Sequence, residues 1–218
     1  MTRVEQEAYL ELLDYRRRVN TLYAEVRALL STDPVAAHAH WRAGRDRLFG
    51  THPQSALPAH ERAKFTRLAY RDYDPALAFS APIRALPHER YDVGTSTGDA
   101  IPFVRFGAVD LPVGTLEVFW LDAYGGGVFL PFRDLTSGRT TYGGGRYLLD
   151  TAKGADLGGD GGALRLDFNF AYHPSCHYDP QWVCPLAPPS NRLEVPIDAG
   201  ELTYPGASAH ELAWCAPG

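Results

Sequence analysis

Two segments in the second half of the chain concentrate side chains that bind anions or transfer protons. The first, residues 131–147, carries Arg133 and Arg146 together with Tyr142 and Tyr147. Guanidinium groups bind carboxylates and phosphates through paired hydrogen bonds, and a phenol can act as an acid or a base. This segment therefore predicts a binding site for a small anion.

The second segment, residues 167–178, combines Asp167, Asn169 and Tyr172 with Cys176, and it leads into a Pro-rich stretch. Such a stretch predicts a long, ordered loop, and loops of that kind on a β scaffold often carry function. The candidate catalytic residues are Tyr142, Asp167, Tyr172 and Cys176. The candidate ligand-binding residues are Arg133, Arg146, Tyr147, Asn169 and Asn191. We expect the arginines and these neighbours to converge on one open pocket.

A structural interpretation of the same residues stays open. Gly143–Gly145 either allow a backbone to approach a ligand closely or form a tight turn, and Arg133 either binds the anion or pairs with a nearby acid. The glycines lack the spacing of a phosphate-binding loop, and no helix follows them. The sequence implies no cofactor.

Cys176 and Cys184 lie eight positions apart in the Pro-rich loop and admit several interpretations. A disulfide is sterically possible, but three cysteines in the whole chain are typical of a reducing cytoplasm. His173 and His177 could complete a zinc site with the two thiols, although the spacing matches no standard motif. Cys176 could be a nucleophile with His173 as its base, or both cysteines could be small buried residues. We expect them to be reduced and metal-free.

The composition divides the chain near residue 75. Residues 1–75 contain 2 Gly and 4 Pro, and residues 76–218 contain 19 Gly and 13 Pro. We therefore expect a helical segment over 1–75, packed on a β-rich body over 76–218 that carries the site.

The first helix should span residues 3–31, with an apolar stripe at spacings of three and four. Asp33 can cap a second helix that begins at Pro34, runs to about Phe49 and is closed by Gly50. The stripe either packs on the chain's own body or forms a coiled-coil-like contact. We expect residues 3–31 to support a homodimer, because the stripe is longer than a small barrel needs.

Short β-type runs separated by turns follow residue 80. They are Ile101–Phe106, Thr115–Leu121, Gly127–Phe132, Arg146–Leu149, Ala163–Phe168 and Leu193–Ile197. Because no helical pattern separates them, they predict a mainly β fold, an antiparallel barrel or sandwich with the N-terminal helical segment.

The 218 residues carry a net charge of −5, and 45% of them are apolar. These values are typical of a globular protein and disfavour a nucleic-acid partner, which usually needs a basic excess. No apolar run reaches the roughly 18 residues of a membrane helix. We expect a cytoplasmic protein whose partner is a small, anionic molecule.

The sequence resembles an uncharacterised bacterial family, domain of unknown function 1684. The resemblance rests on FRDLTSGRTTYGGGRYLLD, LDFNFAYHPSCHY and CPLAPPSNRLEVPIDAGE and covers roughly residues 5–201. It implies a bacterial origin, a β-rich body and a recurring polar set that includes Asp134, Thr141, Tyr178 and the candidates above, but no reaction. His173 and His177 depart from the family pattern, and residues 202–218, with Cys215, extend past its usual end.

Two functions remain. The leading interpretation is an enzyme that acts on a small anionic metabolite in a β-barrel pocket, with a tyrosine or aspartate as acid or base. The alternative is a non-catalytic ligand-binding or protein-interaction module. An open pocket with an acid–base pair would favour the enzyme, whereas polar residues that satisfy each other would favour the module.

Overall fold

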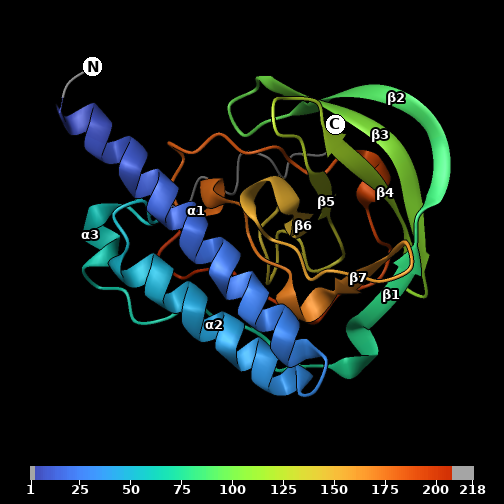
Figure 1. Ribbon diagram of the computed structural model, residues 1–218, viewed down its shortest axis with the longest axis horizontal. Helices are drawn as coiled ribbons and strands as arrows, with labels where there is room; N and C mark the ends of the chain where they lie inside the picture. Colours follow the sequence, from blue (N-terminus) through green and yellow to red (C-terminus); the bar gives the residue numbers. More distant parts are fainter. Residues whose placement is uncertain (1–2, 208–218) are drawn as a thin grey trace.

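The computed structural model describes residues 3–207, in which a helical layer packs against a β-rich body (Figure 1). Helices α1 (Arg3–Leu30) and α2 (Pro34–Thr51) lie side by side, and the short α3 (Ala59–Arg62) follows. The Asp33 side chain accepts a 2.9 Å hydrogen bond from the Ala36 N–H, so the predicted cap is confirmed. Gly50 does not close α2, because the helix continues to Thr51 and the His52 N–H still bonds to the Leu48 carbonyl.

The body contains two antiparallel sheets. A five-stranded sheet has the order β2 (Arg84–Gly94), β3 (Ala100–Leu111), β4 (Gly114–Leu121), β5 (Val128–Phe132) and β6 (Arg146–Asp150). A two-stranded sheet pairs β1 (Ala78–Pro82) with β7 (Ala163–Asp167). Within residues 3–207 no ladder joins the outer strands β2 and β6, so of the two expected architectures the sandwich is present, and the barrel with its barrel pocket is not.

Five of the six expected strands are present, and the sixth is not. Residues 193–197 follow residues 133–135 through separate main-chain bonds, such as Leu193 N–H to the Arg133 carbonyl at 2.8 Å, without forming a continuous strand. Pro196 has no N–H with which to extend the pairing. The sequence pattern missed β1 and β2 because β2 is largely exposed, contains Pro87 and lacks a regular apolar alternation.

An apolar core between the two sheets holds the body together. Its buried members include Val109, Leu116, Val118, Leu130, Phe132, Leu149, Leu166, Phe168, Leu193 and Ile197. Several of these come from the loop after residue 190, so that loop closes the core rather than hanging free from it.

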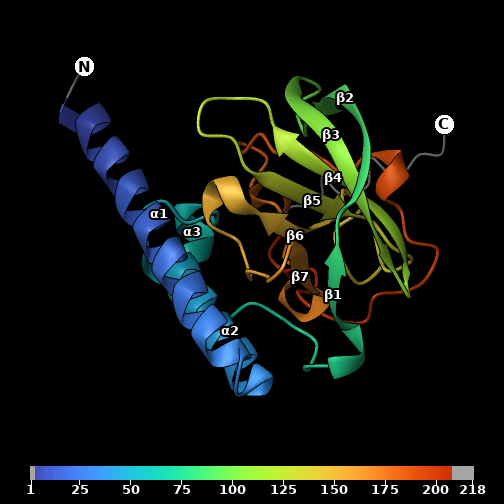
Figure 2. The same ribbon diagram turned by 45° about the vertical axis from the view of Figure 1, so that its right-hand side comes forward.

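The helical layer has its own core against the body. Leu22 and Val26 of α1 and Trp41 of α2 are buried with Leu157 and Phe170 of the body. The apolar stripe of α1 therefore packs on its own chain from about Tyr15 onward. Figure 2 shows the first turns of α1 extending beyond the body, and there Tyr9 and Leu10 are 67% and 59% exposed.

Across residues 3–207, no helix is both long enough and apolar enough to span a bilayer.

Candidate functional site at the helix–body boundary

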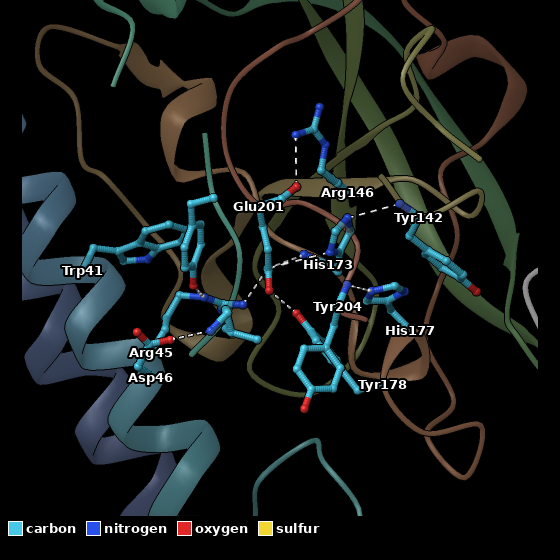
Figure 3. A network of polar contacts seen from close by, with 12 residues as sticks. Trp41, Arg45, Asp46, Tyr142, Arg146, His173, His177, Tyr178, Glu201 and Tyr204 are labelled. Atoms are coloured by element: carbon cyan, nitrogen blue, oxygen red, sulfur yellow. Dashed lines mark hydrogen bonds and ion pairs between the residues drawn. The ribbon is translucent and has the colours of Figure 1, made fainter. Parts of the chain in front are cut away.

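A buried ion pair joins the helical layer to the body. The Arg45 guanidinium on α2 donates a 2.7 Å hydrogen bond to the Glu201 carboxylate and a 3.0 Å bond to the Tyr70 hydroxyl. Glu201 is 0% exposed and also accepts bonds from the Tyr178 hydroxyl and, at 2.9 Å, from the His173 N–H. Figure 3 shows these donors converging on the carboxylate. Burial disfavours the charged form of Arg45, but the Glu201 carboxylate and the nearby phenols of Tyr70 and Tyr178 together outweigh it, so the pKa of Arg45 is raised.

Aromatic rings surround the Arg45 guanidinium. Its carbon lies 5.1 Å from the Trp41 ring centre, 5.2 Å from that of Phe49 and 4.9 Å from that of Tyr172. Trp41, Arg45 and Phe49 share a helical face because they are spaced by four residues. Cation–π contacts of this kind stabilise a desolvated guanidinium.

His173 lies beside this network in one defined tautomer. Its Nε2 accepts a 3.2 Å hydrogen bond from the Tyr142 N–H, so the proton of the neutral ring resides on Nδ1, which faces Glu201 Oε2 at 4.0 Å. Burial, together with nearby His177 and Arg146, holds the pKa of His173 well below its usual value. His173 is therefore neutral at physiological pH.

An inner cavity of about 100 Å³ lies between α1, α2 and the body. Tyr23 and Arg45 line it from the helices, and Tyr147, Asp150 and Tyr172 line it from the body. Desolvation raises the pKa of the Asp150 carboxyl, and Lys153 partly counteracts this from 3.6 Å. The cavity thus combines a cation, phenols and a carboxyl whose pKa is raised by burial.

An outer cavity of about 290 Å³ adjoins the inner one. Both are lined by Tyr15, Lys153 and Ser175, and the outer one adds Arg16 and Trp182. The Lys153 side chain is 59% exposed, so this residue lines the part of the cavity that is open to solvent. Together the two cavities form a cleft, which we call the α1 cleft.

Two of the sequence-predicted residues line the α1 cleft. Tyr147 and Tyr172 face the inner cavity, and their rings pack edge to face at 5.8 Å. The Tyr147 hydroxyl donates to the Pro185 carbonyl. Burial raises the pKa of both phenols, so both stay neutral at physiological pH.

Arg146 lies in the interior of the body and lines neither the inner nor the outer cavity. It is 1% exposed, and its guanidinium donates at 2.8 Å to the Asp134 carboxylate and at 3.0 Å to the Ile197 carbonyl. It also donates to the carbonyls of Ala199 and Glu201. These bonds tie the segment 197–201 to β6.

Three more of the predicted residues form hydrogen bonds within the protein, mainly to main-chain groups. The Asn191 amide bonds to both main-chain groups of Glu117 and to the Pro131 carbonyl. The Asn169 amide bonds to both main-chain groups of Asp74 and to the Asp167 carboxylate. Asp167 also accepts a 3.1 Å bond from the Tyr73 hydroxyl. These side chains replace strand pairing where the chain is irregular.

The glycines before β6 form a turn against the protein's own backbone. Gly145 has a φ of +98°, and a Cβ there would lie 2.5 Å from the Phe132 carbonyl oxygen. The Arg133 N–H bonds to the Asn191 carbonyl at 2.8 Å, which holds that residue's backbone in the same region.

Tyr142, Cys176 and Cys184 form a second small cluster. The Tyr142 hydroxyl lies 3.8 Å from Cys176 Sγ, and the Cys176 N–H donates a 3.3 Å bond to Cys184 Sγ. Both thiols are free. In the part of the chain that the structure describes, no three His, Cys, Asp or Glu side chains are arranged to hold a metal ion. Cys215 lies outside the described residues.

Sequence reasoning did not nominate Glu201, Asp150 or Lys153, and it treated Arg45 mainly as a packing residue. The usable signal was the position of Arg45 on one helical face with Trp41 and Phe49, because an arginine on a buried aromatic face needs a carboxylate partner.

The proteins that this chain is similar to have no stated activity. The model of the family described as "Protein of unknown function (DUF1684)" matches residues 63–202, so α1 to α3 lie before the match. The solution NMR structure of an uncharacterised protein of Haloarcula marismortui is 34% identical, with a TM-score of 0.51, covering 74% of this chain and 90% of that one. No curated protein matches.

Proposed function

Because the chain belongs to the DUF1684 family, whose description states no activity, we propose a function from its own geometry: the α1 cleft binds a small organic anion. The observation that carries this proposal is the outer cavity, which presents Arg16 and Lys153 beside Tyr15 and Trp182. Among the described residues that line it, none is acidic.

The charges favour an anion at the opening and not at the bottom of the α1 cleft. Arg45 is already neutralised by Glu201 at 2.7 Å, so it offers a positioned charge rather than a free one. Lys153 lies 3.6 Å from Asp150, and Arg16 is exposed. A carboxylate or phosphate would therefore lie between Arg16 and Lys153.

The size of the inner cavity and its aromatic lining limit the uncharged part of the ligand. Tyrosine and tryptophan rings offer apolar faces with a polar tip, and the inner cavity of about 100 Å³ takes only a few heavy atoms. We infer a small metabolite whose anionic end faces the opening and whose compact, uncharged end enters among Tyr23, Tyr147 and Tyr172.

An enzyme is the second candidate, and Asp150 favours it. This carboxyl is buried in the inner cavity, its pKa is raised by desolvation, and Tyr172 lines the same space. A carboxyl that retains its proton nearer neutrality can donate it to a bound molecule. In that case Asp150 would be the acid, and Tyr172 would position the substrate.

The binding proposal is tested by thermal unfolding with phosphate, citrate and benzoate at constant ionic strength, with chloride as reference. A ligand at one hundred times its Kd stabilises by about 2.7 kcal/mol, which raises Tm by roughly 5–10 °C for a chain of this size. We expect the double variant Arg16→Ala/Lys153→Ala to lose this shift. Arg17→Ala/Lys64→Ala, a matched charge removal outside both cavities, should keep it.

The same measurement can contradict the proposal. If none of the three anions raises Tm, or if both double variants lose the shift equally, the α1 cleft is not the anion site. For the enzymatic candidate, Asp150→Asn should retain binding and lose turnover of any substrate found, because the amide cannot donate a carboxyl proton.

Two further expectations belong to this proposal. A homodimer through α1 would use the exposed Tyr9, Leu10 and Leu13, since Leu22 and Val26 already pack on the body. Light scattering of the intact chain and of Leu10→Glu tests it, and a monomeric intact chain at micromolar concentration contradicts it. The free thiols of Cys176 and Cys184 are compatible with the cytoplasmic location that we infer.

A further inference from the structure

Hydrogen-bond donors lie close to Cys184 Sγ. It accepts a 3.3 Å bond from the Cys176 N–H, and the neighbouring Cys176 thiol and Ser175 N–H also lower its pKa. Donors that converge on sulfur stabilise the thiolate, which is the nucleophilic form of cysteine. The surroundings of Cys184 therefore differ from those of an inert core cysteine.

The two thiols respond in opposite directions. The hydrogen bond from Cys176 lowers the pKa of Cys184 to about 7, against the opposing effect of burial. The same contact raises the pKa of Cys176. The pair thus consists of a thiolate and a neighbouring thiol, and a thiol with a pKa near ambient pH is the most effective attacking group.

The two residues are close enough to be linked. The Cys176 nitrogen is 3.3 Å from Cys184 Sγ, and an N–Cα bond is about 1.46 Å, so the Cys176 Cα is at most about 4.8 Å from that sulfur. The Cα–Cα separation that a disulfide needs is about 4.4–6.8 Å, and the contact of the Cys176 nitrogen with Cys184 Sγ brings the two residues next to each other.

Cys184 can be reached only by a small molecule. It is 2% exposed, yet it lines the outer cavity of about 290 Å³. A hydroperoxide is compact enough to enter, whereas a protein disulfide is not.

We propose that Cys184 and Cys176 are a peroxide-reactive pair, in which Cys184 attacks the hydroperoxide and Cys176 then closes a disulfide. The Cys184 thiolate sulfur attacks the outer oxygen of ROOH, the O–O bond breaks, and RO⁻ takes a proton to leave as ROH. Cys176 then loses its proton and attacks the sulfur of the Cys184 sulfenic acid. The S–O bond breaks, hydroxide leaves as water, and the S–S bond forms. Two thiols lose two electrons, and the peroxide gains them.

The test uses hydrogen peroxide and the full chain in a Cys215→Ser background, so that only the two thiols titrate. With one equivalent of peroxide, the parent should lose both thiols and the mass of two hydrogen atoms. Cys176→Ser should instead gain one oxygen atom on Cys184, which dimedone traps as a sulfenic acid. Cys184→Ser should react at least tenfold more slowly than the parent.

The pH dependence separates this chemistry from slow oxidation of an ordinary thiol. Because the thiolate is the reacting form, the oxidation rate of the parent should rise about tenfold per pH unit below the pKa of Cys184, about 7, and level off above it. A rate that still rises at pH 9, a sulfenic acid on Cys176 rather than Cys184, or two single variants that react as fast as the parent would each overturn the proposal. Circular dichroism of each variant confirms that it is folded before the reaction.

Discussion

Two buried arginines stabilise different parts of this protein. Arg146 lies inside the body and bonds to Asp134 and to carbonyls of residues 197–201. Arg45 comes from α2 and bonds to Glu201 across the boundary between the helical layer and the body. Arg146 lies in the family-matched segment 63–202, and Arg45 lies before it. Arg146 therefore stabilises the body. Arg45 attaches the helical layer, which the family match does not include, to the body.

The surroundings of the two guanidinium groups differ as well. Burial lowers the pKa of Arg146 despite Asp134, whereas at Arg45 the effect of burial is outweighed by Glu201 together with nearby phenols, and the pKa is raised. Both remain charged at neutral pH. Arg146 gains much of its stabilisation from carbonyl dipoles, and Arg45 gains it from one carboxylate and several rings, so their removal should have different structural consequences.

Loss of Arg146 should have the largest effect. Arg146→Met removes the donor to a buried carboxylate and to several carbonyls, and breaking a buried pair in this way costs about 3–5 kcal/mol. Urea unfolding followed by circular dichroism should show that loss in one transition that includes the β-body. A variant within about 1 kcal/mol of wild type would show that solvent reaches the Asp134 region.

Loss of Arg45 should be milder and regional. Arg45→Met leaves Glu201 buried but still bonded to the Tyr178 hydroxyl and the His173 N–H, so we expect a loss of about 2–3 kcal/mol. Hydrogen exchange should accelerate first in α1 and α2. Arg45→Met/Glu201→Gln is the control, because the amide oxygen still accepts a bond from the buried donors and no unpaired charge remains, so stability should recover. Equal acceleration in β3 and β4 would contradict the regional role.

Acid should weaken the helix–body boundary more gradually. Burial and nearby Arg42 lower the pKa of His38 to about 4 in the folded protein, against about 6.5 when unfolded. Between these values the unfolded chain holds a proton that the native one lacks. The free energy of unfolding should therefore fall as pH drops, by up to about 1.4 kcal/mol per pH unit for this group.

The acid effect can be assigned by comparing two histidines. His38→Phe should reduce the slope of unfolding free energy against pH between 6.5 and 4. The same change at His88, which is exposed on β2, should leave the slope unaltered. An equal slope in both variants would exclude His38 as the titrating group.

The smallest effect should come from an ion pair on the surface. Arg84 and Asp110 form a bidentate contact at 2.7 and 3.0 Å, but their side chains are 53% and 54% exposed. Water screens such a pair, so Arg84→Ala should leave the urea midpoint unchanged within error. A clear shift would mean that this edge of the sheet is held more tightly than its exposure indicates.

Local signals predicted the helices well. The Asp33–Pro34 start, the α1 stripe and five strands depend on neighbours within a few residues, and the structure contains them. The site was harder because amides and guanidinium groups that bond to a ligand and those that bond to the main chain look alike in a sequence. Asn169, Asn191 and Arg146 were nominated for their chemistry, and each one satisfies the chain's own polar groups.

Arg45 and Glu201 are too far apart in the sequence for a local pattern to predict their contact. Nothing near residue 45 specifies a partner 156 positions later. Tyr147 and Tyr172 were nominated as phenols in two polar segments, and an isolated bridge places them together. Asp150 and Lys153 enter the α1 cleft only once the helices have docked.

That separation also sets an order of events during synthesis. The helical layer leaves the ribosome before the body, and Glu201 follows 156 residues behind Arg45. At about 5–20 residues per second, Arg45 waits roughly 8–30 s for its counter-charge. During that interval Trp41 and Phe49 have no body to cover them, so the nascent helices are the segment that a chaperone would protect. The α1 cleft can form only after Cys184, the last residue that lines it, has been made.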